Sequence, residues 1–150
     1  MDALEILRQM HVEAKSAFQH IEQAGPDQRG QLWMKLHPHL KLHEQLEEQW
    51  VYDPVHTEIG SRDQVLQDWH HRHHEEVGEA ERVIGEINRL DPQDNHWLEM
   101  VTGLRMTLEG HIKTEEGEIW PHIRQVWGMD KLEHAGTEIE KAARVGERAA

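Results

Sequence analysis

The apolar residues of this chain recur every three or four positions, which is the spacing of helices with one buried face. Four long stretches show this pattern, from Leu4 to Ile21, Leu32 to Trp50, Leu66 to Ile87 and Trp97 to Ile119. A shorter stretch runs from Leu132 to Ala142. We find no run of alternating apolar and polar residues of the kind that marks a half-buried strand. The sequence therefore predicts an all-α protein.

Residues that break helices separate the five stretches. Gly25-Pro26-Asp27, Gly60-Ser61, Asp91-Pro92 and Gly128 stand between successive stretches, while Pro38 lies inside the second and should kink it or end its first segment. Short connections make consecutive helices antiparallel neighbours. We therefore expect an antiparallel up-down four-helix bundle over residues 1–127, followed by a short C-terminal helical extension over residues 128–150.

Histidines and glutamates interrupt the apolar stripes at positions that should face the bundle interior. An unpaired buried carboxylate or imidazole costs free energy, and a bound metal ion would turn that cost into binding energy. We expect seven such residues to be metal ligands, namely His11, His43, Glu47, His70, His74, His111 and Glu115.

The spacing of these residues supports one shared site. His43-x-x-x-Glu47 and His111-x-x-x-Glu115 repeat the same pair, and residues four apart lie on one helix face. In antiparallel neighbours, residues at the same depth are equally far from the connecting loop. His11 and His43 are equally far from residue 27, inside the first breaker cluster. His74 and His111 meet the same condition around Asp91-Pro92, and Glu47 and His70 meet it beside Gly60.

Several neighbouring residues compete for the same roles. His73 also falls on the buried stripe and could replace His74, although His70 and His74 are four apart and could share one metal ion. His39 could join the site, and Glu116 could take the place of Glu115. His20 lies on the opposite face of the first helix from His11, so we do not expect it to be a ligand.

Composition limits the possible partners. The chain has 150 residues, which fits one domain, and 14 of them are histidine. Its net charge of -13 should repel nucleic acid and anionic membranes. It has no cysteine, which excludes disulfides and thiolate zinc sites. The N-terminus lacks the pattern of a signal peptide, and no apolar run is long enough to span a bilayer, so we expect a soluble, cytoplasmic monomer or homodimer.

The ordered set of motifs resembles a hemerythrin-like domain of the HHE cation-binding type. The resemblance covers roughly residues 4–127. It rests on Leu7-Arg8-Gln9-Met10-His11, His43-x-x-x-Glu47, His70-x-x-x-His74, and His111-x-x-x-Glu115-Glu116 followed by Pro121. Oxygen carriers of this family place an aspartate five residues after the last histidine. This chain has Glu115 four residues and Glu116 five residues after His111, which is more similar to the bacterial HHE domains, whose roles are diverse.

The resemblance implies two non-haem iron ions with an oxo or hydroxo bridge. One iron would take His70, His74 and His111, the other His11 and His43, with Glu47 and Glu115 bridging. This set leaves one open position, on the iron with two histidines, where dioxygen, peroxide or nitric oxide would bind.

Three functions fit such a centre. The first is binding of dioxygen or a related small ligand. The second is an enzyme of the peroxidase, catalase or oxidase kind. The third is iron handling. Zinc or nickel would also suit the imidazoles. A ferritin-like bundle is a poorer match, because the chain has no pair of Glu-x-x-His motifs.

Overall fold

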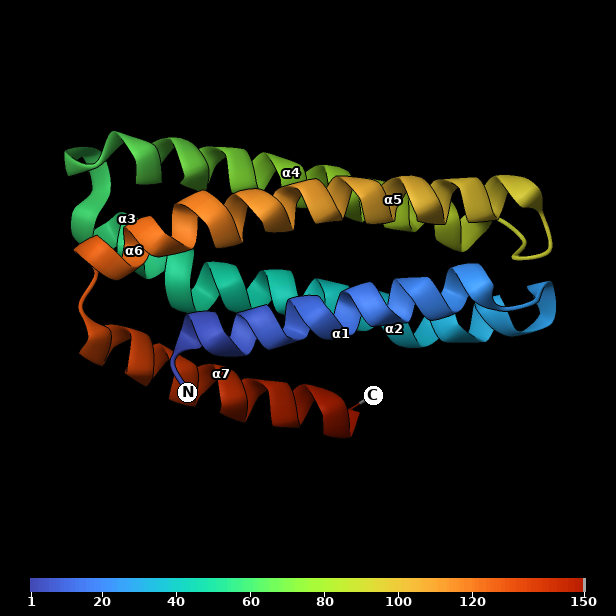
Figure 1. Ribbon diagram of the computed structural model, residues 1–150, viewed down its shortest axis with the longest axis horizontal. Helices are drawn as coiled ribbons and strands as arrows, with labels where there is room; N and C mark the ends of the chain where they lie inside the picture. The colour runs from blue at the N-terminus through green and yellow to red at the C-terminus, as the bar shows by residue number, and fades with distance from the viewer. Residues whose placement is uncertain (150) are drawn as a thin grey trace.

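The computed structural model describes the backbone of residues 1–149 and the side chains of residues 1–146. Its long helices form an antiparallel up-down bundle, with a further helix packed along one side (Figure 1). This confirms the predicted fold class. The bundle helices are α1 (Ala3–Gln23), α2 (Pro26–Glu47), α4 (Gln64–Arg89) and α5 (Asn95–Thr114), and the additional helix is α7 (Met129–Ala149).

Aspartates start three of the bundle helices. The side chains of Asp2, Asp63 and Asp94 accept hydrogen bonds from backbone N–H groups in the first turns of α1, α4 and α5. Helix α2 starts instead with Pro26 just after Gly25, where the missing N–H of proline has no helical partner to lose. Pro38 does not end α2, which continues to Glu47.

Two π-helical segments occupy equivalent places in the two halves of the bundle. The first, Glu48–Tyr52, follows Glu47, and the second, Glu115–Ile119, begins at the other glutamate of the repeated pair. Each leads into a short helix whose second residue is proline, α3 (Asp53–Ile59) and α6 (Trp120–Val126). Because proline donates no backbone hydrogen bond, it favours such a local change in the helical ladder. The wider turn also changes which side chains of the next segment face the interior.

The apolar core is divided into two clusters. One lies towards the α1–α2 and α4–α5 turns and contains Phe18, Trp33, Leu36 and Trp97. The other lies at the opposite end of the bundle, where α7 contributes Leu132, Ala135 and Ile139. Along α1, α4 and α5, the buried histidines and glutamates come between the residues of these two clusters, and His43 does so on α2. The polar layer is therefore enclosed by apolar residues on both sides.

Helix α7 packs against the first turn of α1. Gly136 lies directly against the backbone at the start of α1. A Cβ atom at this position would lie 2.6 Å from the carbonyl oxygen of Met1 and 2.9 Å from the nitrogen of Ala3. Lys131 adds an ion pair with Glu58, and Arg124 of α6 pairs with Asp2 at 2.7 Å. The division between residues 1–127 and 128–150 stays a prediction, and Ala150 lies outside the described residues. Among residues 1–149, the helices are all too short or too polar to cross a bilayer.

We predict that Gly136→Ala destabilises the protein by about 1–3 kcal/mol, because the added methyl group meets backbone atoms that cannot rotate away. Gly103→Ala is the matched control. It also lies inside a helix, but a Cβ there meets nothing within 4 Å, so the change should stabilise by up to about 1 kcal/mol. Urea unfolding followed by circular dichroism measures both. Equal free energies of unfolding for the two variants would contradict the close packing of α7 on α1.

Candidate metal centre

Four helices bring a buried cluster of histidines and glutamates together between the two apolar clusters. Its side-chain atoms form two overlapping groups, within each of which they lie within 4.8 Å of one another. One group contains His11, His43, Glu47 and Glu115, and the other contains Glu44, Glu47, His73 and His111. Glu47 and Glu115 are fully buried, and His73 is 1% exposed. Two ions could therefore lie side by side with Glu47 common to both.

Glu47 lies between the histidines of three helices. Its Oε1 atom faces His43 and lies 3.4 Å from Nε2 of His11, while its Oε2 atom lies 3.0 Å from Nε2 of His73. The two oxygens of one carboxylate thus face the two groups separately. This is the arrangement that a carboxylate needs in order to bridge two cations.

Glu115 also lies between histidines of two helices, but it faces both of them with the same oxygen. Its Oε1 atom lies 3.4 Å from Nε2 of His11 and 3.2 Å from Nε2 of His111. Its Oε2 atom accepts a hydrogen bond from the hydroxyl group of Tyr52. Trp120 in turn donates a hydrogen bond of 2.9 Å to the Tyr52 oxygen. The bond from Tyr52 fixes the orientation of this carboxylate.

Carboxylates outside the cluster face the far side of three of its histidines. The Nδ1 atoms pair with glutamates as follows: His11 with Glu116, His73 with Glu48, and His111 with Glu76. Arg8 and Arg72 balance the charges of Glu116 and Glu76. An imidazole held in this way by Nδ1 presents Nε2 to the centre, which is how proteins orient histidine ligands of metals.

The electrostatics show that the buried carboxylates require cations. Burial favours the neutral form of His11, yet contacts with Glu115 and Glu47 outweigh it and raise the pKa of His11 to about 10. At His73, contacts with Glu44 and Glu47 outweigh burial and raise the pKa to about 11. At His111, contact with Glu115 outweighs burial and raises the pKa to about 9. The same contacts hold the pKa of Glu47 well below its usual value despite burial. Metal ions can supply the positive charge in place of protons.

A group of buried atoms in the cluster makes no hydrogen bond to other described residues. These atoms are His11 Nε2, both ring nitrogens of His43, His111 Nε2, Glu44 Oε2, Glu47 Oε1 and Glu115 Oε1. Buried polar atoms without partners are rare in folded proteins because they lose their hydration without compensation. Here they converge on one place and consist of imidazole nitrogen and carboxylate oxygen, so the residues present fit a metal site.

The structure brings five of the seven predicted ligands together, namely His11, His43, Glu47, His111 and Glu115. It places His70 and His74 outside the cluster. His70 lies 3.0 Å from Asp53 and stacks on His56, and the side chain of His74 is 81% exposed.

His73 takes the place that we predicted for His70 and His74. The buried stripe of α4 runs through Leu66, Trp69 and His73. His70 follows Trp69 and His74 follows His73, so both point away from the interior. Trp69 was the missed signal. A large apolar residue three after Leu66 and four before His73 fixes the buried face better than the spacing of the histidines does.

Other residues at the centre were not predicted. Glu44 joins the second group, Glu48 and Glu76 support histidines, and Tyr52 reaches Glu115. Glu44 follows His43 directly in the sequence, a spacing that gave no signal of its own. Glu116 lies behind His11 rather than within either group, and neither group includes His39 or His20.

Comparisons with known proteins identify the family of the chain and support its fold. A family model for the hemerythrin HHE cation-binding domain matches residues 2–123. The crystal structure of a hemerythrin HHE cation-binding domain-containing protein from Mycobacterium kansasii has a similar fold, with a TM-score of 0.79 and 21% identity over 99% of this chain and 86% of that one. A DNA nickase from Nostoc sp. is 24% identical over 144 residues, which are 95% of this chain and 39% of that protein. The chain thus spans about two fifths of the length of the curated relative.

We predict that His73→Ala abolishes metal binding at its group, whereas His74→Ala leaves the metal content unchanged. These neighbours on α4 differ in burial and in contact with the cluster, so they form a matched pair. Loss of a direct ligand should weaken affinity by more than the roughly 10- to 100-fold caused by losing an outer partner. Elemental analysis after metal loading measures the content. Full loading of His73→Ala would contradict the placement, as would loss of metal from His74→Ala.

Proposed function

Because this chain belongs to the hemerythrin HHE cation-binding family, we propose that its buried cluster binds two iron ions and, at that centre, dioxygen or a related small ligand. His11, His43, Glu47 and Glu115 would hold one ion. Glu44, Glu47, His73 and His111 would hold the other. Glu47 would serve both ions, and Glu115 would do so as well, since it lies between His11 and His111.

The observation that carries this proposal is the convergence of unpartnered buried nitrogen and oxygen atoms from four helices. The donor set supports iron because it combines imidazoles with shared carboxylates and contains no thiolate. Iron held here would supply redox chemistry towards dioxygen, peroxide or nitric oxide. The ligand set differs from the predicted one, because α4 contributes one histidine and Glu44 contributes an additional carboxylate.

On the side of Tyr52, Trp69 and Trp120, the surrounding residues would keep bulk water from the centre. The ring of Trp69 lies 5.3 Å from that of His111, centroid to centroid, and the ring of Trp120 stacks on His11 at 4.9 Å. Both tryptophans and Tyr52 are buried. A dry surrounding strengthens electrostatic interactions inside the site and hinders loss of a bound ligand to protonation.

Tyr52 supports an enzyme as the second candidate function. Burial and the neighbouring Glu115 and Glu47 raise the pKa of Tyr52 well above its ordinary value, so its hydroxyl group keeps the proton. That proton is held on the hydrogen bond to Glu115, at the edge of the cluster. A proton donor at this place is what a peroxide- or dioxygen-consuming enzyme needs and what an oxygen carrier must keep away from its ligand.

Cleavage of DNA is not part of this proposal. The nickase from Nostoc sp. shares only 39% of its length with this chain. The net charge of -13 would oppose binding to a phosphate backbone.

We expect two iron ions per chain in protein reduced without air. Exposure to air should then produce charge-transfer bands in the visible spectrum. Bands that persist would favour a binder of dioxygen, and rapid decay to a stable oxidised spectrum would favour an enzyme or iron handling. Elemental analysis with optical spectroscopy measures both. Protein that takes up zinc but no iron would contradict the proposal.

A second prediction concerns Tyr52→Phe. If Tyr52 supplies a proton, turnover of hydrogen peroxide should fall by about 100-fold or more, because general acid catalysis contributes on that order. Iron content should stay the same, since Tyr52 is not among the proposed ligands. Trp50→Phe is the control, because it also removes a polar group from an aromatic side chain, two residues earlier and outside the cluster. Unchanged turnover at equal iron content would assign Tyr52 the role of orienting Glu115.

A further inference from the structure

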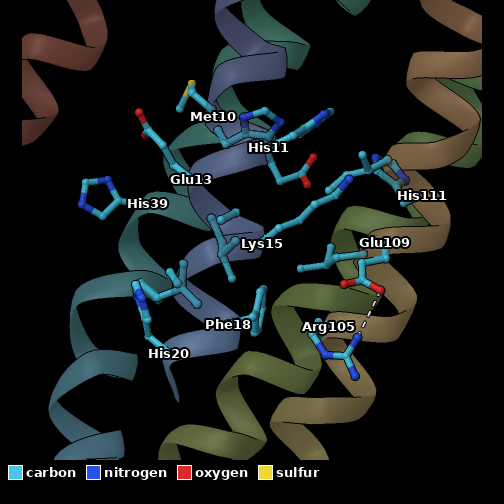
Figure 2. Close-up of a pocket in the computed structure, with 18 of the residues that line it drawn as sticks. Met10, His11, Glu13, Lys15, Phe18, His20, His39, Arg105, Glu109 and His111 are labelled. Carbon is cyan, nitrogen blue, oxygen red and sulfur yellow. Dashed lines mark hydrogen bonds and ion pairs between the residues drawn. The ribbon is translucent and has the colours of Figure 1, made fainter. Parts of the chain in front are cut away.

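A cavity opens beside the metal centre, on the side facing the apolar cluster that contains Phe18 and Leu36. It has a volume of about 320 Å3 and lies between α1, α2 and α5. His11, His43 and His111 form its inner end, and Figure 2 shows His11 and His111 at the same end of the pocket. A molecule in this cavity would therefore lie against the histidines of the centre.

The walls of the cavity are largely apolar. They include Ala14 and Phe18 of α1, Leu36 and Leu40 of α2, and Leu108 of α5. Phe18 and Leu36 are buried. Cavities of about 300–1,000 Å3 with apolar walls and a few polar groups are typical of sites for small organic molecules.

The cavity is much larger than a diatomic ligand requires. One water molecule takes up about 30 Å3 in the liquid, so the cavity could hold about ten groups of that size. Dioxygen and peroxide have two heavy atoms each and would leave most of it empty. Apolar space of this size next to a metal centre fits an organic molecule better.

Half of the charged side chains that line the cavity are already paired. Arg105 pairs with Glu22 and Glu109, and Glu44 pairs with His73.

Three charged side chains of the lining remain, namely Lys15, Lys35 and Glu13, and they form no ion pair with other described residues. Two of the three are cations, in a chain whose net charge is -13. Lys15 extends from α1 across the pocket towards α5 (Figure 2).

We propose that this cavity binds a small apolar monocarboxylate of about ten non-hydrogen atoms. The apolar chain would lie among Phe18, Leu36 and Leu108, with its far end towards the histidines of the centre. The carboxylate would lie at the rim with Lys15 and Lys35, where it stays partly hydrated. This names an organic ligand for the proposed iron site, but the cavity is formed by the chain itself and does not require iron.

Calorimetric titration with octanoate, on protein of measured metal content, tests the proposal. Ala14→Phe should weaken octanoate binding by about tenfold or more, because the ring occupies space that several methylene groups would fill. Val12→Phe is the matched control, since Val12 is 62% exposed two residues earlier on the same helix. Leu108→Phe narrows the same cavity and replaces Ala14→Phe if that variant does not fold. Equal affinities of the folded cavity variant and Val12→Phe would overturn the proposal.

Octanamide, a neutral molecule of the same shape, tests the role of charge. Lys15→Met should weaken octanoate by roughly threefold, as for an exposed ion pair, and leave octanamide unchanged. Lys41→Met is the control, because Lys41 lines a different cavity. Equal losses for both ligands would overturn the carboxylate assignment. If the protein binds octanoate as expected but holds no iron, the result would contradict the iron site and leave the cavity proposal intact.

Discussion

The arrangement of the bundle depends on one buried carboxylate. Glu47 is fully buried, and an isolated carboxylate in that environment would cost several kcal/mol. Histidines of α1, α2 and α4 face its two oxygens, so three helices must hold a fixed depth relative to one another. Glu115 relates α5 to α1 in the same way through His111 and His11. The geometry of the centre and the packing of the bundle are thus one constraint.

Burial of the two apolar clusters compensates for the free-energy cost of the buried polar layer. They enclose the polar layer on both sides, so the bundle gains burial energy at its ends while the middle carries the charged groups. The π-helical segments join the polar layer to the apolar cluster to which α7 contributes. The first puts Tyr52, five residues after Glu47, beside Glu115, a residue of the other half of the bundle. A π-helical turn holds more residues than an α-helical turn. In a regular α-helix, Tyr52 and the residues after it would therefore point in different directions around the helix axis.

Much of the fold and part of the centre could be predicted from the sequence. Apolar spacing and breakers predicted the bundle, and equal distances from the turns placed His11, His43 and His111 at one depth. On α4 the spacing alone could not choose among His70, His73 and His74, which lie within about one helical turn of one another. Only the facing direction separates them, and Trp69 sets it. Tyr52 and Glu44 could not be found, because their positions depend on the π-helical turn and on packing between α2 and α4.

The two sides of the centre differ in what they offer a reactant. On the side of Tyr52, Trp69 and Trp120 the packing is closed, and the hydroxyl group of Tyr52 holds a proton against Glu115. On the opposite side, His11, His43 and His111 border an apolar cavity with lysines at its rim. A ligand would thus approach from the open side while the proton is held on the closed side. This asymmetry is what the enzyme, the second function proposed above, would need, because simple storage needs neither a proton donor nor room for an organic molecule.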